Sequence, residues 1–202
     1  MNSLSERILG NAALYDAVQR AAGLEGLRRR LAPILGRLGP GTLLDVGAGT
    51  GAFYPLIPPH VTYVPLDTDT RKLERLREKH KGVNSVVGSA TALPFNDASF
   101  DYTLCTNVSH HLSDPDFHLL VAELARVTRQ QLVFVDPLRV NRLASRILWS
   151  IDRGSYPRPY EELVAKLTSR FAGQQAETLT LLHKYVLFVG TPIPGDRAAA
   201  AT

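Results

Sequence analysis

From residue 42 onward, short apolar runs alternate with longer amphipathic stretches. The mostly apolar runs cover residues 42–46, 62–66, 85–87, 102–106 and 131–135. Runs of this length and composition are typical of strands that are buried on both faces of a parallel sheet, and the stretches between them have helical spacing. The pattern therefore predicts five parallel strands joined by crossover helices.

The stretch at 116–128 is the clearest predicted helix. Asp114 can cap it, Pro115 suits its first position, and its apolar side chains recur at helical spacing. These side chains are Phe117, Leu120, Leu124 and Val127. Residues 70–79 are rich in charge and helical in pattern, so they predict a helix on the outside of the sheet.

Two further helices are predicted ahead of the first strand. Residues 3–22 and 24–38 carry apolar side chains at helical spacing, and Pro33 is expected to bend or break the second helix. Residues 1–39 are therefore expected to form an N-terminal helical cap.

The alternation of strands and helices breaks near the C-terminus. Residues 177–182 and 185–189 are strand-like and only His183 and Lys184 separate them, which predicts an antiparallel hairpin. The predicted fold class is α/β, a Rossmann-like open sheet of mainly parallel strands that ends in this hairpin, with helices on both faces. Ligands bind such sheets outside the carboxyl ends of the strands.

The chain has 202 residues, which suits one domain around one core. Behind the helical cap we expect a core at 40–137, a lid insertion at 138–160, and a C-terminal helix and hairpin at 161–191. Cys105 is the single cysteine, so no intrachain disulfide can form and a cytoplasmic location is expected. No run reaches the roughly 18 unbroken apolar residues of a membrane-spanning helix.

A glycine-rich loop, Asp45–Gly51, follows the first strand and is expected to open a helix. Glycines let the backbone approach a ligand closely, and a helix N-terminus favours an anion. With Ala52 in the last place, the loop also fits the dinucleotide pattern, so it does not choose between cofactors. Asp67, at the end of the second strand, can accept both hydroxyls of a ribose in either case.

Four stretches, taken together, separate these cofactors. They are Leu43–Phe53, Val64–Leu73, Gly88–Asp101 and Asn107–Pro115. In this order they resemble the class I S-adenosylmethionine-dependent methyltransferases, in particular the small-molecule branch that is similar to the ubiquinone and menaquinone biosynthesis enzymes. The resemblance covers residues 40–137, about half of the chain. It implies an enzyme whose cofactor is S-adenosylmethionine and whose cofactor-binding part is this core.

The resemblance also implies which residues hold the cofactor. The backbone of the glycine loop would cradle the methionine part, the carboxylate of Asp67 would hold the ribose, and the segment after the third strand would flank adenine. The implied residues are Asp45, Gly47, Ala48, Gly49, Asp67, Thr68, Ser89, Ala90 and Asn107. Ser89 stands where the family usually has an acidic residue, so we expect cofactor binding to be weaker by about 1 kcal/mol.

Transfer to a hydroxyl acceptor also needs a group that takes the proton, and histidine suits this role near neutral pH. His110 and His111 follow the fourth strand, at the expected ligand edge. Neighbouring residues point in different directions, so one of the two is expected to reach the acceptor. His111 is favoured as the base, and the alternative is an ordinary capping or core histidine.

Other polar residues at this edge have two interpretations each. Asp136 ends the fifth strand and either orients the acceptor or caps a helix after Pro137. His183 either orients the acceptor or is a turn residue. No metal is expected, because the carboxylates that a hard divalent ion prefers are missing around Asn107.

The acceptor is expected to be a small molecule, lipid-like or aromatic, methylated at oxygen or carbon. Arginines alternate with apolar residues in the insertion, which suits either a lid with a solvated face or peripheral contact with an anionic membrane. Net charge is +4, and the triplet Arg28–Arg30 is interpreted as a solvated helix face, so no nucleic acid partner is expected. The alternatives are a noncatalytic cofactor-binding accessory protein and an RNA or protein methyltransferase.

Overall fold

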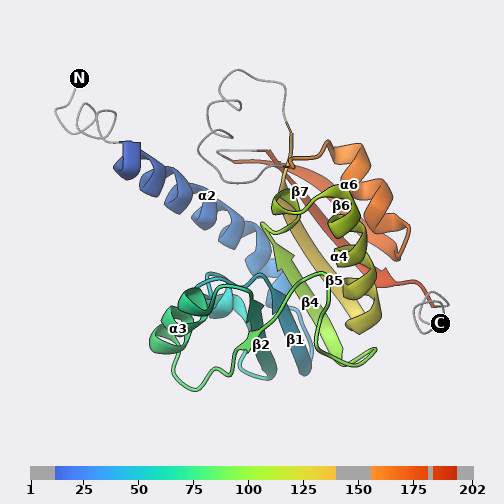
Figure 1. Ribbon diagram of the computed structural model, residues 1–202, viewed down its shortest axis with the longest axis horizontal. Helices are drawn as coiled ribbons and strands as arrows, with labels where there is room; N and C mark the ends of the chain where they lie inside the picture. Colours follow the sequence, from blue (N-terminus) through green and yellow to red (C-terminus); the bar gives the residue numbers. More distant parts are fainter. Residues whose placement is uncertain (1–11, 140–155, 182–183, 195–202) are drawn as a thin grey trace.

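The computed structural model describes residues 12–139, 156–181 and 184–194 of the protein (Figure 1). Its centre is a seven-stranded sheet in the order β3-β2-β1-β4-β5-β7-β6. The strands are β1 Gly41–Val46, β2 Val61–Asp67, β3 Val86–Val87, β4 Phe100–Thr106, β5 Thr128–Pro137, β6 Phe171–Thr180 and β7 Lys184–Pro192.

The first five strands run parallel, and β7 is antiparallel to both β5 and β6. In the middle of the sheet, Leu44 is in register with Val64 of β2 and Thr103 of β4. The predicted fold class is therefore confirmed. The hairpin strand β6 begins at Phe171, six residues before the predicted start, because its exposed polar face hides it from an apolar pattern.

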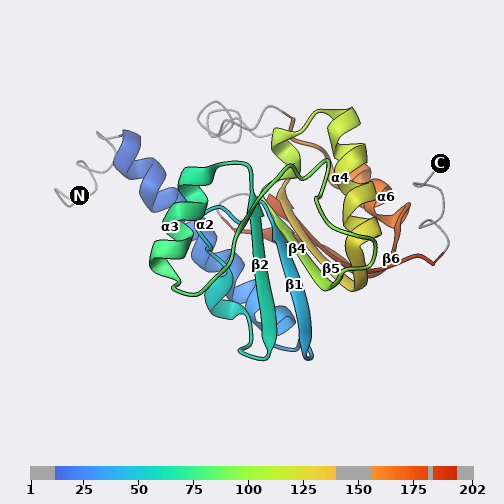
Figure 2. The ribbon, with the colours of Figure 1, turned by 60° about the horizontal axis from the view of Figure 1, so that its bottom comes forward.

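Helices cover both faces of the sheet (Figure 2). On one face, α4 (Asp114–Val127) and α6 (Tyr160–Thr168) pack against the strands through Phe117, Leu120 and Leu163. On the other face, α2 (Ala12–Leu35) packs through Leu27 and Leu31. Each face thus has its own continuous apolar core, which is why the central strands are apolar on both sides.

The N-terminal prediction of two helices needs a correction within the described residues. A single helix, α2, runs from Ala12 to Leu35, and Pro33 lies inside its last turn. A proline removes one backbone donor and disturbs the preceding turn, but here the helix ends only two residues later. Pro33 therefore does not break α2, which ends three residues before the predicted end at residue 38. The first eleven residues of the predicted cap lie outside the described part of the chain.

The prediction of a helix after the glycine loop is also wrong. A short 3-10 helix, η1 (Tyr54–Leu56), replaces it, and the chain then turns into β2. Pro55, Pro58 and Pro59 lie in this segment. Because prolines cannot donate the backbone hydrogen bonds that a longer helix needs, the segment stops after one turn.

Two other helices lie close to their predicted positions in the chain. The charged outer helix α3 (Thr70–Lys79) begins after Asp69, whose side chain accepts a hydrogen bond from the backbone N–H of Arg71. Helix α4 is capped by the side chain of Ser113 and not by Asp114, which lies in its first turn. No helix among the described residues is both long and apolar enough to cross a membrane.

Candidate functional site

The glycine loop lies at the carboxyl edge of the sheet, between the ends of β1, β2 and β4. The backbone N–H groups of Gly47 and Ala48 both donate to the carbonyl of Leu66, at 2.8 and 3.0 Å. Gly47 has a φ of +74°, and a Cβ atom there would run into the side chain of Val108. The loop therefore needs glycine both for its left-handed backbone and for the close approach of the segment after β4.

Asp67 closes this loop from the end of β2. Its carboxylate is 8% exposed and accepts hydrogen bonds from the N–H groups of Gly49 (2.8 Å) and Asp69 (2.9 Å). Each oxygen thus has one bond to the backbone and keeps a second lone pair, which a ribose hydroxyl could use. Thr68, between Asp67 and Asp69, is exposed.

Asp45 has a different environment from Asp67. It is 1% exposed, and one carboxyl oxygen accepts a hydrogen bond from the hydroxyl of Tyr63 at 2.6 Å, while the other has no partner among the described residues. Burial raises the pKa of Asp45 to about 7, and the negative charge of Asp67 adds to this shift. Tyr63 was not predicted as part of the site, because it reads as an ordinary strand residue.

Ser89 and Ala90 follow β3 at the same edge. The Gly88 N–H donates to the carbonyl of Asp67, which joins this segment to the end of β2. Ser89 is exposed, and its hydroxyl lies 2.8 Å from that of Thr91. The hydroxyl that stands in the place of the family's acidic residue is thus already engaged with a neighbour.

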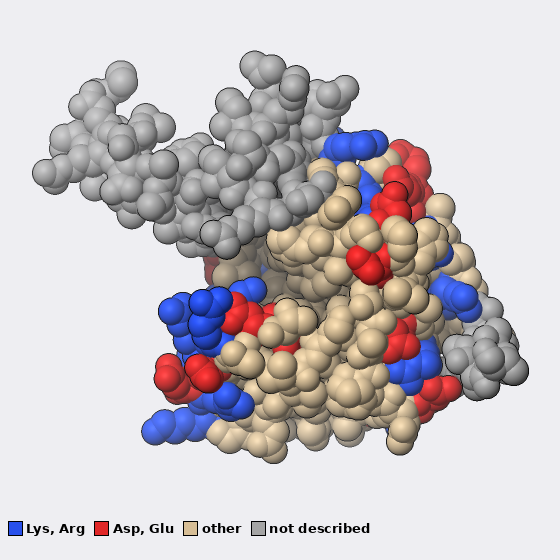
Figure 3. All heavy atoms as spheres, in the orientation of Figure 1, with Lys and Arg blue, Asp and Glu red and all other residues tan. Residues whose placement is uncertain are grey.

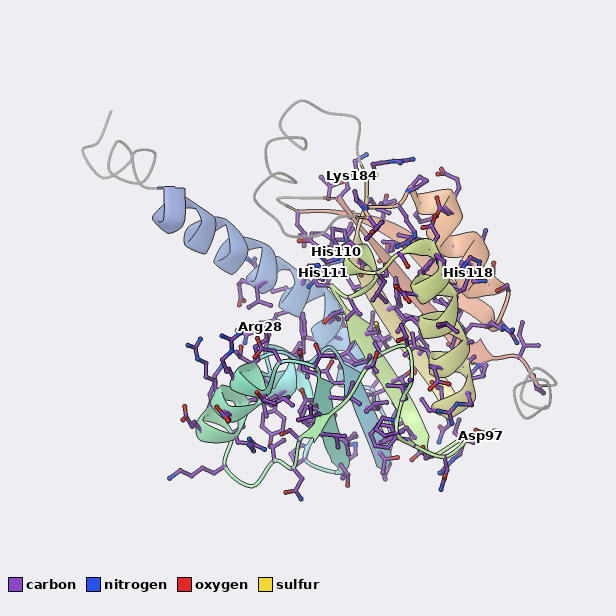
Figure 4. The ribbon with its side chains drawn as sticks, viewed as in Figure 1. Arg28, Asp97, His110, His111, His118 and Lys184 are labelled. Atoms are coloured by element: carbon purple, nitrogen blue, oxygen red, sulfur yellow. The ribbon has the colours of Figure 1, made fainter. Side chains whose placement is uncertain are left out.

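The segment after β4 carries both histidines. It begins with Asn107, which has a φ of +56°, an uncommon and strained value for a residue other than glycine. The 3-10 helix η2 (Ser109–His111) follows directly. His110 is 3% exposed, whereas His111 is exposed, and their rings contact each other with centroids 4.0 Å apart and planes tilted by 42° (Figure 4).

Asp136 holds this histidine turn, defined here as residues 107–112. Its carboxylate accepts hydrogen bonds from the backbone N–H groups of Val108 (2.9 Å), Ser109 (2.8 Å) and His110 (3.2 Å). A fourth contact joins it to Nδ1 of His110 at 2.8 Å. The interpretation of Asp136 as a cap after Pro137 is therefore wrong: β5 continues through Pro137, and Asp136 caps the histidine turn instead.

Two arginines near the site were not predicted. Arg158 is 4% exposed and binds the carbonyls of Ser109 and Leu112 on the opposite side of the histidine turn. Arg28 directs Nε and Nη2 of its guanidinium at the carbonyl of Ala52, at 2.9 and 2.7 Å, and so joins α2 to the glycine loop. Arg28 is therefore half-buried against the glycine loop, whereas Arg29 and Arg30 are exposed, as expected of a solvated helix face. The sequence could have indicated this contact, because Arg28 lies on the same side of the helix as the apolar residues Leu24, Leu27 and Leu31.

The surface is hollowed beside the charged side chains of α3, in the part of the molecule where these strands end (Figure 3). In Figure 4, Arg28 lies on the side of α3, and both histidines lie at the carboxyl end of β4. Among the described residues, no three His, Cys, Asp or Glu side chains come together as metal ligands. His183 and residues 140–155 of the predicted lid lie outside the described part of the chain.

Sequence comparison identifies the central region. Residues 44–135 match the family model described as a methyltransferase domain. An uncharacterized methyltransferase from Mycobacterium sp. (strain JLS) is 38% identical over 89 residues, which are 44% of this chain and 34% of the relative. The match thus spans about a third of the length of the curated relatives.

Solved structures share the fold over most of this chain. Magnesium protoporphyrin IX methyltransferase (ChlM) from Synechocystis PCC 6803 with bound SAH has a TM-score of 0.69 at 16% identity, over 93% of this chain and 92% of that chain. Geranyl diphosphate methyltransferase in complex with SAM has a TM-score of 0.68 at 18% identity, over 83% and 84% of the two chains. The narrower likeness to ubiquinone and menaquinone enzymes stays a prediction. Residues 44–135 match the model of a methyltransferase domain, and the chain shares its fold with these solved methyltransferase structures.

Proposed function

We propose that the protein transfers a methyl group from S-adenosylmethionine to a small-molecule acceptor, at oxygen or carbon. The observation that carries the proposal is the shared edge of the sheet. There, Asp67 closes a glycine loop through Gly49, and Asp136 at the end of β5 contacts the buried His110 that follows β4. One half of this edge suits a cofactor and the other half suits proton transfer from an acceptor.

The described residues fit the cofactor. A buried carboxyl oxygen of Asp45 has no partner among them, and each carboxylate oxygen of Asp67 accepts one backbone N–H group and keeps a second lone pair. The backbone of residues 47–49 would hold the methionine part, Asp67 the ribose, and Ser89 with Ala90 the adenine. When bound, S-adenosylmethionine supplies an electrophilic methyl group on a sulfonium, and the protein must align the acceptor with it and exclude water.

His111 is the proposed base, because it is the exposed member of the histidine pair. Asp136 contacts Nδ1 of His110, which directs the ring proton of His110 to Nδ1 and makes Nε2 its basic nitrogen. His110 then supports His111 through the contact between their tilted rings. Asp136 acts in this proposal as a positioning residue, since its carboxylate is occupied by the turn.

Substitution of each histidine tests this assignment. His111→Ala should lower turnover by about 10²–10⁴-fold if His111 takes the proton, while His110→Ala should lower it through loss of support. Turnover at several pH values, with calorimetry of S-adenosylhomocysteine as the control for folding, separates the two roles. Full activity of His111→Ala with an inactive His110→Ala would move the base to His110, and full activity of both would remove the histidines from the mechanism.

The class of acceptor is supported by two relatives of the fold, one named for a geranyl diphosphate and one for a magnesium porphyrin. We propose a lipid-like or aromatic acceptor of similar kind. Contact with an anionic membrane stays a prediction from the sequence, because most of the residues that suggested it lie outside the described part of the chain.

A labelling experiment tests the whole proposal. The full chain is incubated with S-adenosylmethionine that carries a tritium-labelled methyl group and with a fractionated cell extract, and Asp67→Ala is the control. Label is expected in a small-molecule fraction. Label retained by RNA or protein would overturn the small-molecule acceptor. Heat of binding for S-adenosylhomocysteine without transfer would favour the noncatalytic accessory role, for which the already engaged hydroxyl of Ser89 is an argument.

A further inference from the structure

Arg158 is a buried cation that no part of the proposed chemistry uses. Its side chain is 4% exposed, and it precedes α6 in the chain. Nη2 contacts Oδ1 of Asp114 at 2.6 Å, and Nε lies 3.4 Å from Oε1 of Glu162. The guanidinium also lies over the ring of Phe117, 4.5 Å from its centroid. A charge this deeply buried is costly unless several groups stabilise it, so its position is strongly specified.

The histidine turn supplies the remaining acceptors. Arg158 donates from Nη1 to the carbonyl of Ser109 and from Nη2 to the carbonyl of Leu112, both at 2.9 Å. Between these two, the carbonyl of His110 accepts a hydrogen bond from the backbone N–H of Tyr156 at 3.0 Å. The carbonyl side of the turn is therefore bound by residues 156–158.

Opposite charges hold the two sides of this short turn. Asp136 accepts from the N–H groups of Val108, Ser109 and His110, while Arg158 donates to carbonyls of the same turn. A buried anion at the N–H side and a buried cation at the carbonyl side both match the direction of the peptide dipoles. Neither charge could be moved without moving the histidines.

Arg158 is also joined to the end of β5. Leu138 and Arg158 form an isolated parallel bridge, and the backbone N–H of Arg139 donates to the carbonyl of Arg158 at 2.9 Å. Asp136 lies two residues before Leu138, in β5, which ends at Pro137. The two charges that hold the turn are thus themselves connected through the backbone.

We propose that Arg158 is a positioning residue that sets the place of His110 and His111 in the site. The inference rests on the proposed function, since it gives these histidines their task. It adds that the placement of the histidines depends on a contact from the segment before α6, 49 residues from Ser109 in the chain. A guanidinium is required because its fork reaches several acceptors in one plane, which an ammonium cannot do.

The test compares Arg158→Lys with Arg126→Lys in the full chain. Arg126 is a suitable control because it also binds backbone carbonyls, those of Leu93 and Phe95, and a carboxylate of Glu123, but away from the histidines. The readouts are the ring signals of His110 and His111 in NMR titrations, amide hydrogen exchange of the histidine turn, and affinity for S-adenosylhomocysteine.

In Arg158→Lys we expect amides of the histidine turn to exchange at least about tenfold faster, with both histidine signals shifted, while amides of β4 and β5 stay protected. Affinity for S-adenosylhomocysteine should stay within about twofold. Arg126→Lys should leave the histidine signals in place. Unchanged signals and exchange in Arg158→Lys, at whatever cost in melting temperature, would overturn the proposal. None of these readouts needs turnover, so a failure of the methyl-transfer proposal would be seen separately, in the labelling experiment.

Discussion

Asp45 and Asp67 end neighbouring strands, but their carboxyl groups have opposite surroundings. Asp67 accepts hydrogen bonds from two backbone N–H groups, whereas Asp45 is buried and accepts one hydrogen bond, from the hydroxyl of Tyr63. The same residue type at the same edge therefore has two roles. The Asp67 carboxylate keeps lone pairs for a polar ligand, whereas burial raises the pKa of Asp45 to about 7.

Replacement of Asp67 tests the first role. Asp67→Ala should weaken binding of S-adenosylhomocysteine by about 1–3 kcal/mol, because the charged hydrogen bonds to a ribose are lost. Calorimetry at constant salt measures the change, and Asp69→Ala, which removes the cap of α3 next to it, is the control for local damage. Equal affinity of Asp67→Ala and the unmodified protein would rule out the ribose assignment.

Replacement of Asp45 tests the second role through pH. Burial raises the pKa of Asp45 from 3.8 to about 7, so the protonated form stabilises the folded state. This contribution is fully present below about pH 4 and is lost as the pH rises through about 7, with an upper limit on the order of 4 kcal/mol. Asp45→Asn cannot ionise, so relative to the unmodified protein it should gain stability over this interval.

Urea unfolding at pH 4, 5.5, 7 and 8 measures this difference. Asp101→Asn is the control, because the hydrogen bond from the backbone N–H of Thr42 lowers the pKa of Asp101. Titration of Asp101 therefore changes the stability only below about pH 4. A difference between Asp45→Asn and the unmodified protein that does not change between pH 4 and 7 would contradict the shift.

At the scale of elements, the glycine loop and the histidine turn meet at Gly47 and Val108. Gly47→Ala should destabilise the protein by about 1–3 kcal/mol more than Gly82→Ala. Both glycines have positive φ, at +74° and +86°, but a Cβ atom at Gly82 would meet nothing within 4 Å. The control thus measures backbone strain alone, and the excess measures the contact.

A double substitution separates the two parts of this effect. Val108→Ala shortens the side chain that a Cβ atom at position 47 would meet, so it should recover most of the excess in Gly47→Ala. Urea unfolding of the four combinations gives the coupling energy. If the two effects simply add, the close packing of loop and turn is not what requires glycine.

At the scale of the whole molecule, apolar runs were enough to predict the sheet. Strands β1, β4 and β5 are buried on both faces, so they read as apolar without knowledge of their neighbours. The helix after the glycine loop was wrong because the loop pattern was given more weight than the prolines at 55, 58 and 59. In such short segments, the individual residues, here the prolines, determine whether a helix forms.

The site was predictable where one segment carries its own signal, as with the glycine loop and the paired histidines. It was not predictable where the contact joins distant parts of the chain. Asp114 and Arg158 are 44 residues apart, and Arg28 reaches Ala52 across 24 residues. Asp136 was predicted to be important, but its four donors could not be, since they come from the end of another strand.

The order of the strands has a consequence for synthesis on the ribosome. Strand β7 follows β6 in the chain but lies between β5 and β6, so β6 has no place in the sheet until β7 has arrived. Until then, the apolar residues Leu132–Val135 of β5 form an open edge on the nascent chain. The nascent chain therefore exposes an unpaired, aggregation-prone strand edge while about fifty further residues are synthesised. A chaperone that shields strand edges would act during that interval.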